Sequence, residues 1–259
     1  MVRILGLYRE KKLAGKPEAD NQIADAVGNA LRRKPLVETV EMMRSEGLRL
    51  DFPYPQLIFS MARGPDALSV LSCAAAHAPV VNTPAAVQSC LRRSNLHDTM
   101  AKAGIPFPET RVFKEHEVLG LVPPFVLKRT ATHGKSRDTL LISSKEDIAA
   151  LPALIREIDD SFYLVQELIG GRTFKFYGIG NEIFPLAFAD AASKPKIAEL
   201  ADYARGMARC LDLDVFGGDF IYTSRNEFYF VDVNDWPSFS AIRAEAAEKI
   251  ADLLLARTK

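Results

Sequence analysis

The chain has 259 residues, of which 48% are hydrophobic and 25% are charged, as in an ordinary globular protein rather than a disordered one. Its 33 basic and 33 acidic side chains balance, so the charge gives no reason to expect a nucleic-acid or anionic membrane partner. The three cysteines are scattered and form no CxxC pair, which argues against a disulfide framework or a zinc site. These features indicate a protein of the reducing cytoplasm.

Strand-like and helix-like segments alternate in the first third of the chain. Strands are expected over residues 2–8, 36–42, 56–61 and 79–83, and helices over residues 20–34, 65–78 and 84–103. Pro65 and Pro84 suit the start of a helix, because proline lacks an amide hydrogen that the first turn would leave unpaired. This alternation is typical of a parallel α/β sheet and predicts an N-terminal α/β lobe over residues 1–85.

The pattern changes after Gly104, where strand-like segments follow one another closely. Strands are expected over residues 104–113, 123–130, 139–144, 161–169, 172–180, 181–188, 215–224 and 227–234, with helices over residues 145–158, 194–211 and 240–257. Strands so close together favour antiparallel pairing. We therefore expect two further lobes of α+β type, at residues 86–165 and 166–259.

The stretch EFYFVDVNDW, residues 227–236, begins as a strand and ends in polar residues. Asp232 and Asn234 are two residues apart, so both side chains of a strand would point to one face. Asp219 follows two glycines in the preceding strand, and a hairpin of the two strands would bring the three side chains together. Two carboxylates and an amide oxygen form a hard ligand set suited to Mg²⁺. The alternative is that these residues are simply solvated at strand ends.

A second motif, PPFVLKRTATHGKSRD, places Lys128 at the end of a strand and follows it with a loop of small and polar residues. Small residues let main-chain amides approach phosphate oxygens, while hydroxyl and lysine side chains supply donors and charge. The loop residues suited to phosphate binding are Thr132, His133, Gly134, Lys135 and Ser136. The spacing is not that of a P-loop, and a polar hairpin loop is the alternative.

A third motif, FYLVQELIGG, ends an apolar strand in Gln166 and Glu167. The Glu167 carboxylate can accept a hydrogen bond from the exocyclic amine of adenine, and the Leu168 amide can donate one to a ring nitrogen. An edge strand with polar residues at its exit is the alternative.

The motifs follow one another as a lysine strand, a small-residue loop, a QE strand, a GxD strand and a DxN strand. This order resembles that of the ATP-grasp superfamily, which includes glutamate-adding ligases, glutathione synthetases, D-alanine ligases and inositol-trisphosphate kinases. The resemblance implies an ATP-grasp fold of α/β and α+β class. Such a fold has an N-terminal parallel α/β lobe, a small central α+β lobe and a C-terminal antiparallel-sheet lobe.

The resemblance also implies roles for these residues, with ATP and Mg²⁺ as cofactors. Lys128 would contact the α- and β-phosphates together with Arg92 or Arg93, and residues 130–137 would form a flap over the phosphates. The adenine would be held by Gln166, Glu167 and Leu168, and one or two Mg²⁺ ions by Asp219, Asp232 and Asn234.

The reaction that the resemblance implies is the ATP-dependent joining of a small carboxylate to an amine through an acyl phosphate. Arg172 and Lys175 are the basic residues available, with Lys128, to act on that intermediate. Asp232 stands where many of these ligases have glutamate, whereas the kinase branch of the superfamily has aspartate there. A kinase that phosphorylates a hydroxyl acceptor is therefore one alternative, and a nucleotide-binding module without catalysis is another.

The acceptor is expected to be a small molecule bound beyond the carboxyl ends of the N-terminal strands, as in other open α/β sheets. Arg9 follows the first strand and Arg63 the third, and Pro65 then opens a helix whose N-terminal amides favour an anion. Arg63 and Arg9 are thus expected to bind a carboxylate or phosphate of the acceptor. We expect no nucleic-acid or membrane partner and allow for a homodimer.

Overall fold

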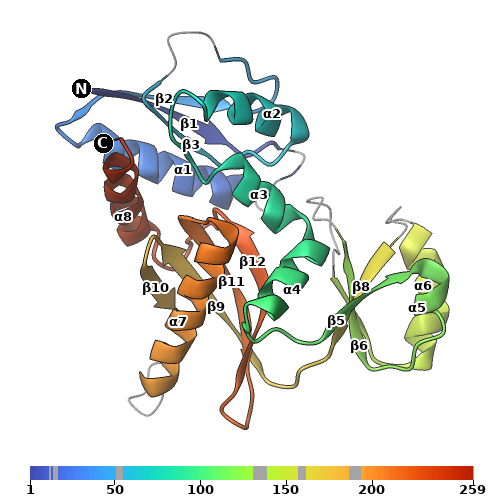
Figure 1. Cartoon of the computed structure of the whole chain (residues 1–259). Helices are drawn as coiled ribbons and strands as arrows, with labels where there is room; N and C mark the ends of the chain where they lie inside the picture. Colours follow the sequence, from blue (N-terminus) through green and yellow to red (C-terminus); the bar gives the residue numbers. More distant parts are fainter. Residues whose placement is uncertain are drawn as a thin grey trace.

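Figure 1 shows the computed structural model of the chain, which describes residues 1–11, 13, 17–50, 55–130, 139–156, 162–186 and 194–258. Three four-stranded sheets organise these residues, one of them parallel and two antiparallel. The α/β and α+β class expected from the sequence is confirmed. No helix in the described part of the chain combines the length and apolar character that crossing a membrane requires.

The N-terminal sheet is parallel and has the order β2-β1-β3-β4. Its strands are β1 (Val2–Tyr8), β2 (Val37–Arg44), β3 (Leu57–Ser60) and β4 (Val80–Val81), and its helices are α1 (Pro17–Arg32) and α2 (Pro65–Ala74). Successive residues of β1 face opposite sides, so Ile4 packs in the core that includes α1, while Leu5 and Leu7 pack in the core that includes α2. This arrangement places Arg9 and Arg63 just beyond the carboxyl ends of β1 and β3.

The single helix expected over residues 84–103 is two helices, α3 (Pro84–Leu91) and α4 (Arg93–Lys102). Arg92 separates them with φ −96° and ψ 81°, outside the helical region. The amide of Arg93 donates to the carbonyl of Thr130 in the central lobe at 2.9 Å. A hydrogen bond to another lobe thus replaces a main-chain hydrogen bond within the helix. The sequence around Arg92 has no glycine or proline that would predict this break in the helix.

The central sheet is antiparallel and has the order β5-β8-β6-β7. Its elements are β5 (Thr110–Lys114), β6 (Phe125–Arg129), β7 (Thr139–Ile142), β8 (Phe162–Glu167), α5 (Glu115–Val118) and α6 (Lys145–Arg156). One face encloses a separate core, made by Val118, Phe125, Leu127, Ile142, Leu151 and Tyr163. Strand alternation therefore puts Lys128 and Gln166 on the opposite face. β8 runs across the boundary predicted between residues 165 and 166, and the domain ranges themselves stay a prediction.

The C-terminal sheet is antiparallel and has the order β10-β9-β11-β12. Its strands are β9 (Arg172–Ile179), β10 (Glu182–Pro185), β11 (Val215–Tyr222) and β12 (Phe228–Asp235). One face packs against α7 (Lys194–Leu211), and on the other Tyr177 and Val215 join the core of α1 and α8 (Arg243–Ala256). The helices α1 and α8 lie side by side in Figure 1, so the N- and C-terminal lobes share one core.

Candidate active site

A cavity of about 240 Å³ lies where the central and C-terminal sheets meet. Strands of both sheets line it, together with the start of α4 and the segment that follows β8. Its walls include these residues that the sequence predicts for nucleotide or metal binding: Arg93, Lys128, Gln166, Glu167, Leu168, Asp219 and Asp232. The other lining residues are Val126, Thr139, Ile169, Thr173, Ile221 and Val231. The structure thus brings side chains from distant parts of the sequence into one place.

Part of the cavity wall, beside the exit of β8, is apolar. Its apolar walls come from three strands and are Val126, Ile221 and Val231. Gln166 is 2% exposed, and its Nε2 donates to Thr110 Oγ1 at 3.0 Å, so its side chain ties β8 to β5. Glu167 is exposed at the same wall. Apolar side chains beside a carboxylate suit an apolar ring that carries polar groups at its edge.

The cationic side of the cavity is formed by Lys128 and Arg93. Lys128 is 7% exposed, and its Nζ donates to the carbonyl of Val231 on β12 at 2.6 Å, which links the two sheets. Burial lowers the pKa of Lys128 to about 8, against the opposing effect of the Asp232 carboxylate. Arg93 is also buried, and its Nη1 has no hydrogen-bond partner among the described residues. Two buried cations, one with an unpaired donor, fit an incoming anion such as phosphate.

His97 lies one helical turn after Arg93 on α4 and joins the same cluster. Its buried ring packs edge-on against Phe107 at 5.3 Å, and its Nδ1 has no hydrogen-bond partner in the described part of the chain. Burial, followed by the charges of Lys128 and Arg93, lowers the pKa of His97 to about 4, so the imidazole is neutral at physiological pH. His97 is not among the residues predicted from the sequence, although its four-residue spacing from Arg93 on a helix could have indicated it.

The acidic side of the cavity is formed by β11 and β12. Asp219 and Asp232 are directly opposite each other in the strand register, and Asn234 is opposite Gly217. Asn234 Nδ2 donates to Asp232 Oδ2 at 2.8 Å, which orients both side chains. A Cβ at Gly218 would lie 2.0 Å from the carbonyl oxygen of Asp232, so glycine is what lets the strands approach here.

This donor set fits Mg²⁺ that arrives with a nucleotide. Asp219, Asp232 and Asn234 offer hard oxygen atoms, the type that Mg²⁺ prefers. Within the described residues, no group of three or more His, Cys, Asp and Glu side chains could hold a metal by itself. Two carboxylates and an amide suit a metal that takes its remaining ligands from phosphates and water.

Comparison with known proteins shows what this arrangement is similar to. No protein-family model and no curated protein sequence matches the chain. A solved RimK domain ATP-grasp protein from Sphaerobacter thermophilus matches with a TM-score of 0.71 at 20% identity, over 98% of this chain and 99% of the other. The chain has the ATP-grasp fold.

Two solved ligases are similar to this ATP-grasp chain over nearly their whole length. D-alanyl-alanine synthetase A from Vibrio cholerae matches with a TM-score of 0.76 at 13% identity, over 99% of this chain and 98% of that one. The VanG D-Ala:D-Ser ligase from Enterococcus faecalis matches with a TM-score of 0.76 at 16% identity, over 100% of this chain and 99% of that one. The expected three-lobed arrangement is therefore confirmed at the level of the fold.

The two basic residues predicted on β9 lie on opposite faces of the C-terminal ATP-grasp sheet. Lys175 is opposite Asp219 in the strand register, and its Nζ lies 2.7 Å from Asp219 Oδ1. Burial works against the charge of this lysine, but the hydrogen bond to Asp219 raises the pKa of Lys175 overall. Arg172, three residues earlier, places its guanidinium over the Phe174 ring at 5.2 Å, on the face that packs against α7. The structure thus brings Lys175, but not Arg172, to the predicted metal ligands.

Two other predicted groups have different outcomes. The sequence predicts that either Arg92 or Arg93 assists Lys128 at the phosphates. In the structure Arg93 lies in the cavity wall, whereas Arg92 is exposed and does not line the cavity. The loop residues Thr132, His133, Gly134, Lys135 and Ser136, with the rest of the predicted flap after residue 130, lie outside the described residues. Their phosphate-binding role stays a prediction.

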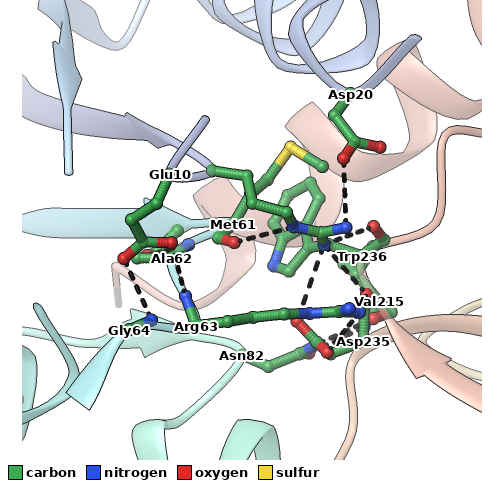
Figure 2. A network of polar contacts seen from close by, with 12 residues as sticks. Glu10, Asp20, Met61, Ala62, Arg63, Gly64, Asn82, Val215, Asp235 and Trp236 are labelled. Carbon is green, nitrogen blue, oxygen red and sulfur yellow. Dashed lines mark hydrogen bonds and ion pairs between the residues drawn. The ribbon is translucent and has the colours of Figure 1, made fainter. Parts of the chain in front are cut away.

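Arg63, predicted to bind the acceptor, faces the carboxylate of Asp235 (Figure 2). Arg9, predicted for the same role, forms a longer ion pair with that carboxylate. Asp235 is fully buried, and Arg63 Nη2 lies 2.7 Å from its Oδ1. Arg9 is buried as well and pairs with Asp20 at 3.1 Å. The structure therefore shows a network within the protein at the position where the sequence predicts an open anion site, because the C-terminal lobe covers the strand ends.

A larger, open groove of about 710 Å³ lies between α7, α8 and the turn from β9 to β10. Its charges largely pair with one another: Lys249 Nζ lies 2.6 Å from Glu182, and Arg257 pairs with Asp214. Charges that are already satisfied give less reason to bind a ligand than the unpaired Arg93 donor of the smaller cavity. We therefore take the smaller cavity as the candidate active site.

Proposed function

We propose that this ATP-grasp protein is an ATP- and Mg²⁺-dependent ligase that joins a small carboxylate substrate to an amine through an acyl phosphate. The observation that carries the proposal is the cavity in which Lys128 and Arg93 face Asp219 and Asp232. The apolar part of the cavity wall beside Glu167 would hold the adenine. The fold of the two similar ligases supports the reaction class, and the balanced charge and scattered cysteines support a cytoplasmic enzyme with a small-molecule acceptor.

The proposed reaction has two steps. A carboxylate oxygen of the substrate attacks the γ-phosphorus of ATP, which forms the acyl phosphate and releases ADP. An amine then attacks the acyl carbon, loses a proton and expels inorganic phosphate, which leaves an amide.

The residues of the cavity would serve these steps by position and charge. Lys128 and Arg93 would hold the phosphates and offset their charge. Lys175, held by Asp219, would face the transferred phosphoryl group from β9. Mg²⁺ bound by Asp219, Asp232 and Asn234 would neutralise phosphate charge and align the phosphoryl group for transfer.

A kinase that acts on a hydroxyl acceptor is the second candidate. Arg172 lies on the far face of β9, so it cannot hold an acyl phosphate in the cavity, and Lys175 is the basic residue of β9 that faces the cavity side. A kinase forms no acyl phosphate and does not need such an arginine, so the position of Arg172 favours the kinase. Screening amino acids, peptides and polyols for stimulated ADP release distinguishes the candidates by their products. The ligase gives ADP, phosphate and an amide in equal amounts, the kinase gives ADP and a phosphorylated acceptor, and a non-catalytic module gives neither.

Mg-ATP is expected to raise the melting temperature of the protein, because a ligand that binds only the folded state stabilises it by mass action. A concentration one hundred times the dissociation constant corresponds to about 2.7 kcal/mol, or a shift of about 5–10 °C for a chain of this size. Differential scanning fluorimetry measures the shift, with Mg²⁺ alone and Lys128→Met as controls. An unchanged melting temperature at millimolar Mg-ATP would remove the basis of the proposed function.

Nucleotide affinity is expected to fall as the pH rises from 7.5 to 9.5. The pKa of Lys128 is lowered to about 8, so its ammonium group loses its proton in this range and no longer attracts phosphate. Well above that pKa, the dissociation constant should rise by up to about tenfold per pH unit, because binding must take up one proton. Calorimetry across this range measures the slope, and Lys128→Met should remove it. A wild-type affinity that is independent of pH would show that the charge of Lys128 does not contribute to binding.

A further inference from the structure

The end of β12 lies at a buried joint between the N- and C-terminal lobes (Figure 2). Asp235, the last residue of the strand, directly follows the proposed metal ligand Asn234 and is fully buried. A buried carboxylate is strongly unfavourable unless opposite charges and hydrogen bonds compensate it. The opposite charges near the Asp235 carboxylate are those of Arg9 and Arg63 in the N-terminal lobe, so these ion pairs connect that lobe to the strand of the proposed metal ligands.

Two arginines hold both the side chain and the main chain at this point. Arg63 Nη2 lies 2.7 Å from Asp235 Oδ1 and donates to the carbonyl of the same residue at 3.0 Å. Arg9 Nη2 donates to the carbonyls of Asp235 at 3.4 Å and Trp236 at 3.1 Å. Burial and then the nearby Arg63 charge lower the pKa of Arg9 to about 10. Burial opposes the charge of Arg63, but the Asp235 carboxylate raises the pKa of Arg63 overall, so both arginines are charged at physiological pH. The two guanidinium groups thus hydrogen-bond the main chain where it leaves β12.

The arginines are themselves fixed within the N-terminal lobe. Arg9 donates to a main-chain carbonyl beyond β3 at 3.2 Å and to Asp20 at 3.1 Å. The main-chain amides of Arg63 and Gly64 both donate to the carboxylate of Glu10 at 3.0 Å. Glu10 therefore occupies the two amides that directly precede α2, beside the position where the sequence predicts an acceptor anion. Arg63 Nε has no hydrogen-bond partner among the described residues, but the other donors named here are engaged, which suits a rigid support better than a substrate site.

The metal-binding strand needs such a support because β12 is the edge strand of its sheet in the described part of the chain. Pairing with β11 fixes the register of Asp232 and Asn234 from one side. The network around Asp235 restrains the end of the strand from the other lobe. Asn82 does the same for the start of β11, since it donates to the Val215 carbonyl at 2.7 Å and accepts from the Val215 amide at 2.9 Å. The N-terminal lobe thus holds both strands at the same end.

We propose that Arg63 is a positioning residue for the metal site: by holding Asp235, it sets the place of Asn234 and Asp232 without lining the nucleotide cavity. The inference rests on the proposed function, because that function makes these two residues Mg²⁺ ligands. Their side chains follow the backbone of β12, so releasing residue 235 lets them move relative to Asp219. The N-terminal lobe then contributes to nucleotide binding through the metal.

The test measures Mg²⁺-dependent nucleotide binding rather than activity. Calorimetry gives the affinity for ADP at a series of Mg²⁺ concentrations in the wild type and in Arg63→Met, Arg63→Lys and Asp235→Asn. Mg²⁺ should increase the affinity for ADP, and the Mg²⁺ concentration at half of this increase is the measured quantity. Arg63→Met should raise that concentration by about tenfold or more, the usual effect of removing a residue that supports metal ligands. The affinity for ADP without Mg²⁺ should change little. Arg63→Lys should be intermediate, because an ammonium group cannot reproduce the fork of the guanidinium.

Leu31→Ala is the matched control, because Leu31 is buried in the core that joins α1 and α8. It should lower the melting temperature without changing the Mg²⁺ dependence. Arg63 and Asp235 variants that lose thermal stability but keep the wild-type Mg²⁺ dependence would overturn the proposal, since Arg63 would then be structural only. If Arg63→Met does not fold, Arg63→Lys and Asp235→Asn decide by the same criterion. A wild type whose ADP binding ignores Mg²⁺ would instead overturn the proposed function.

Discussion

Asp232→Asn is expected to reduce turnover by about a thousandfold or more while the protein stays folded. Asparagine keeps the shape of the side chain but removes the charge that, opposite Asp219, would bind Mg²⁺ under the proposed function. Metal-ion catalysis of phosphoryl transfer contributes several kcal/mol, and a thousandfold corresponds to about 4 kcal/mol. The rate of ADP release at saturating Mg-ATP measures the loss once an acceptor is known. Before that, the Mg²⁺-dependent gain in ADP affinity measures the same interaction.

Asp214→Asn is the control for this substitution. Asp214 immediately precedes β11 but pairs with Arg257 in the distant groove, so its charge does not face the cavity. It should therefore keep the turnover and Mg²⁺ dependence of the wild type. An Asp232→Asn protein with normal Mg²⁺ dependence would show that the metal is held elsewhere, and the acidic side of the cavity would need another explanation.

The convergence of the acidic residues could be predicted from the sequence because it depends on local geometry. Asp232 and Asn234 are two residues apart in a strand, and a short turn pairs that strand with the one that contains Asp219. The same period of two puts Arg172 and Lys175 on opposite faces, and the prediction that both act on the intermediate did not take this into account. Where a position follows from strand alternation, the sequence is sufficient.

The surroundings of Arg9 and Arg63 could not be predicted in the same way. Arg63 reaches Asp235, which is 172 residues away in the chain, and the residues around Arg63 carry no signal of that partner. An arginine beyond a parallel strand meets a ligand only if no other lobe covers the strand end. The break at Arg92 has a similar cause, since the carbonyl of Thr130 that accepts from the next amide belongs to the central lobe. The packing of one lobe against another determines both the partners of these arginines and the helix break at Arg92. No local sequence pattern indicates which lobes pack together.

Trp236→Ala is expected to lower the free energy of unfolding by about 3–5 kcal/mol, as for other large aromatic residues removed from a core. That loss is a large part of the about 5–15 kcal/mol that typically stabilises a folded protein. Trp236 is fully buried in the core that the N- and C-terminal lobes share, with its ring 5.8 Å from that of Phe59. Its Nε1 also donates to the carbonyl of Val81 at 3.2 Å, so the indole joins the lobes by packing and by a hydrogen bond.

Urea unfolding followed by circular dichroism measures the loss, and two further variants separate its causes. Trp236→Phe keeps most of the ring but leaves the Val81 carbonyl without its donor, which should cost about 1–3 kcal/mol. Phe162→Ala removes an aromatic ring that is 46% exposed in the central lobe, and it should cost less than about 1 kcal/mol. Because Trp236 is the chain's one tryptophan, its fluorescence reports on this joint in the wild type. A loss for Trp236→Ala no larger than that for Phe162→Ala would show that the indole does not hold the two lobes together.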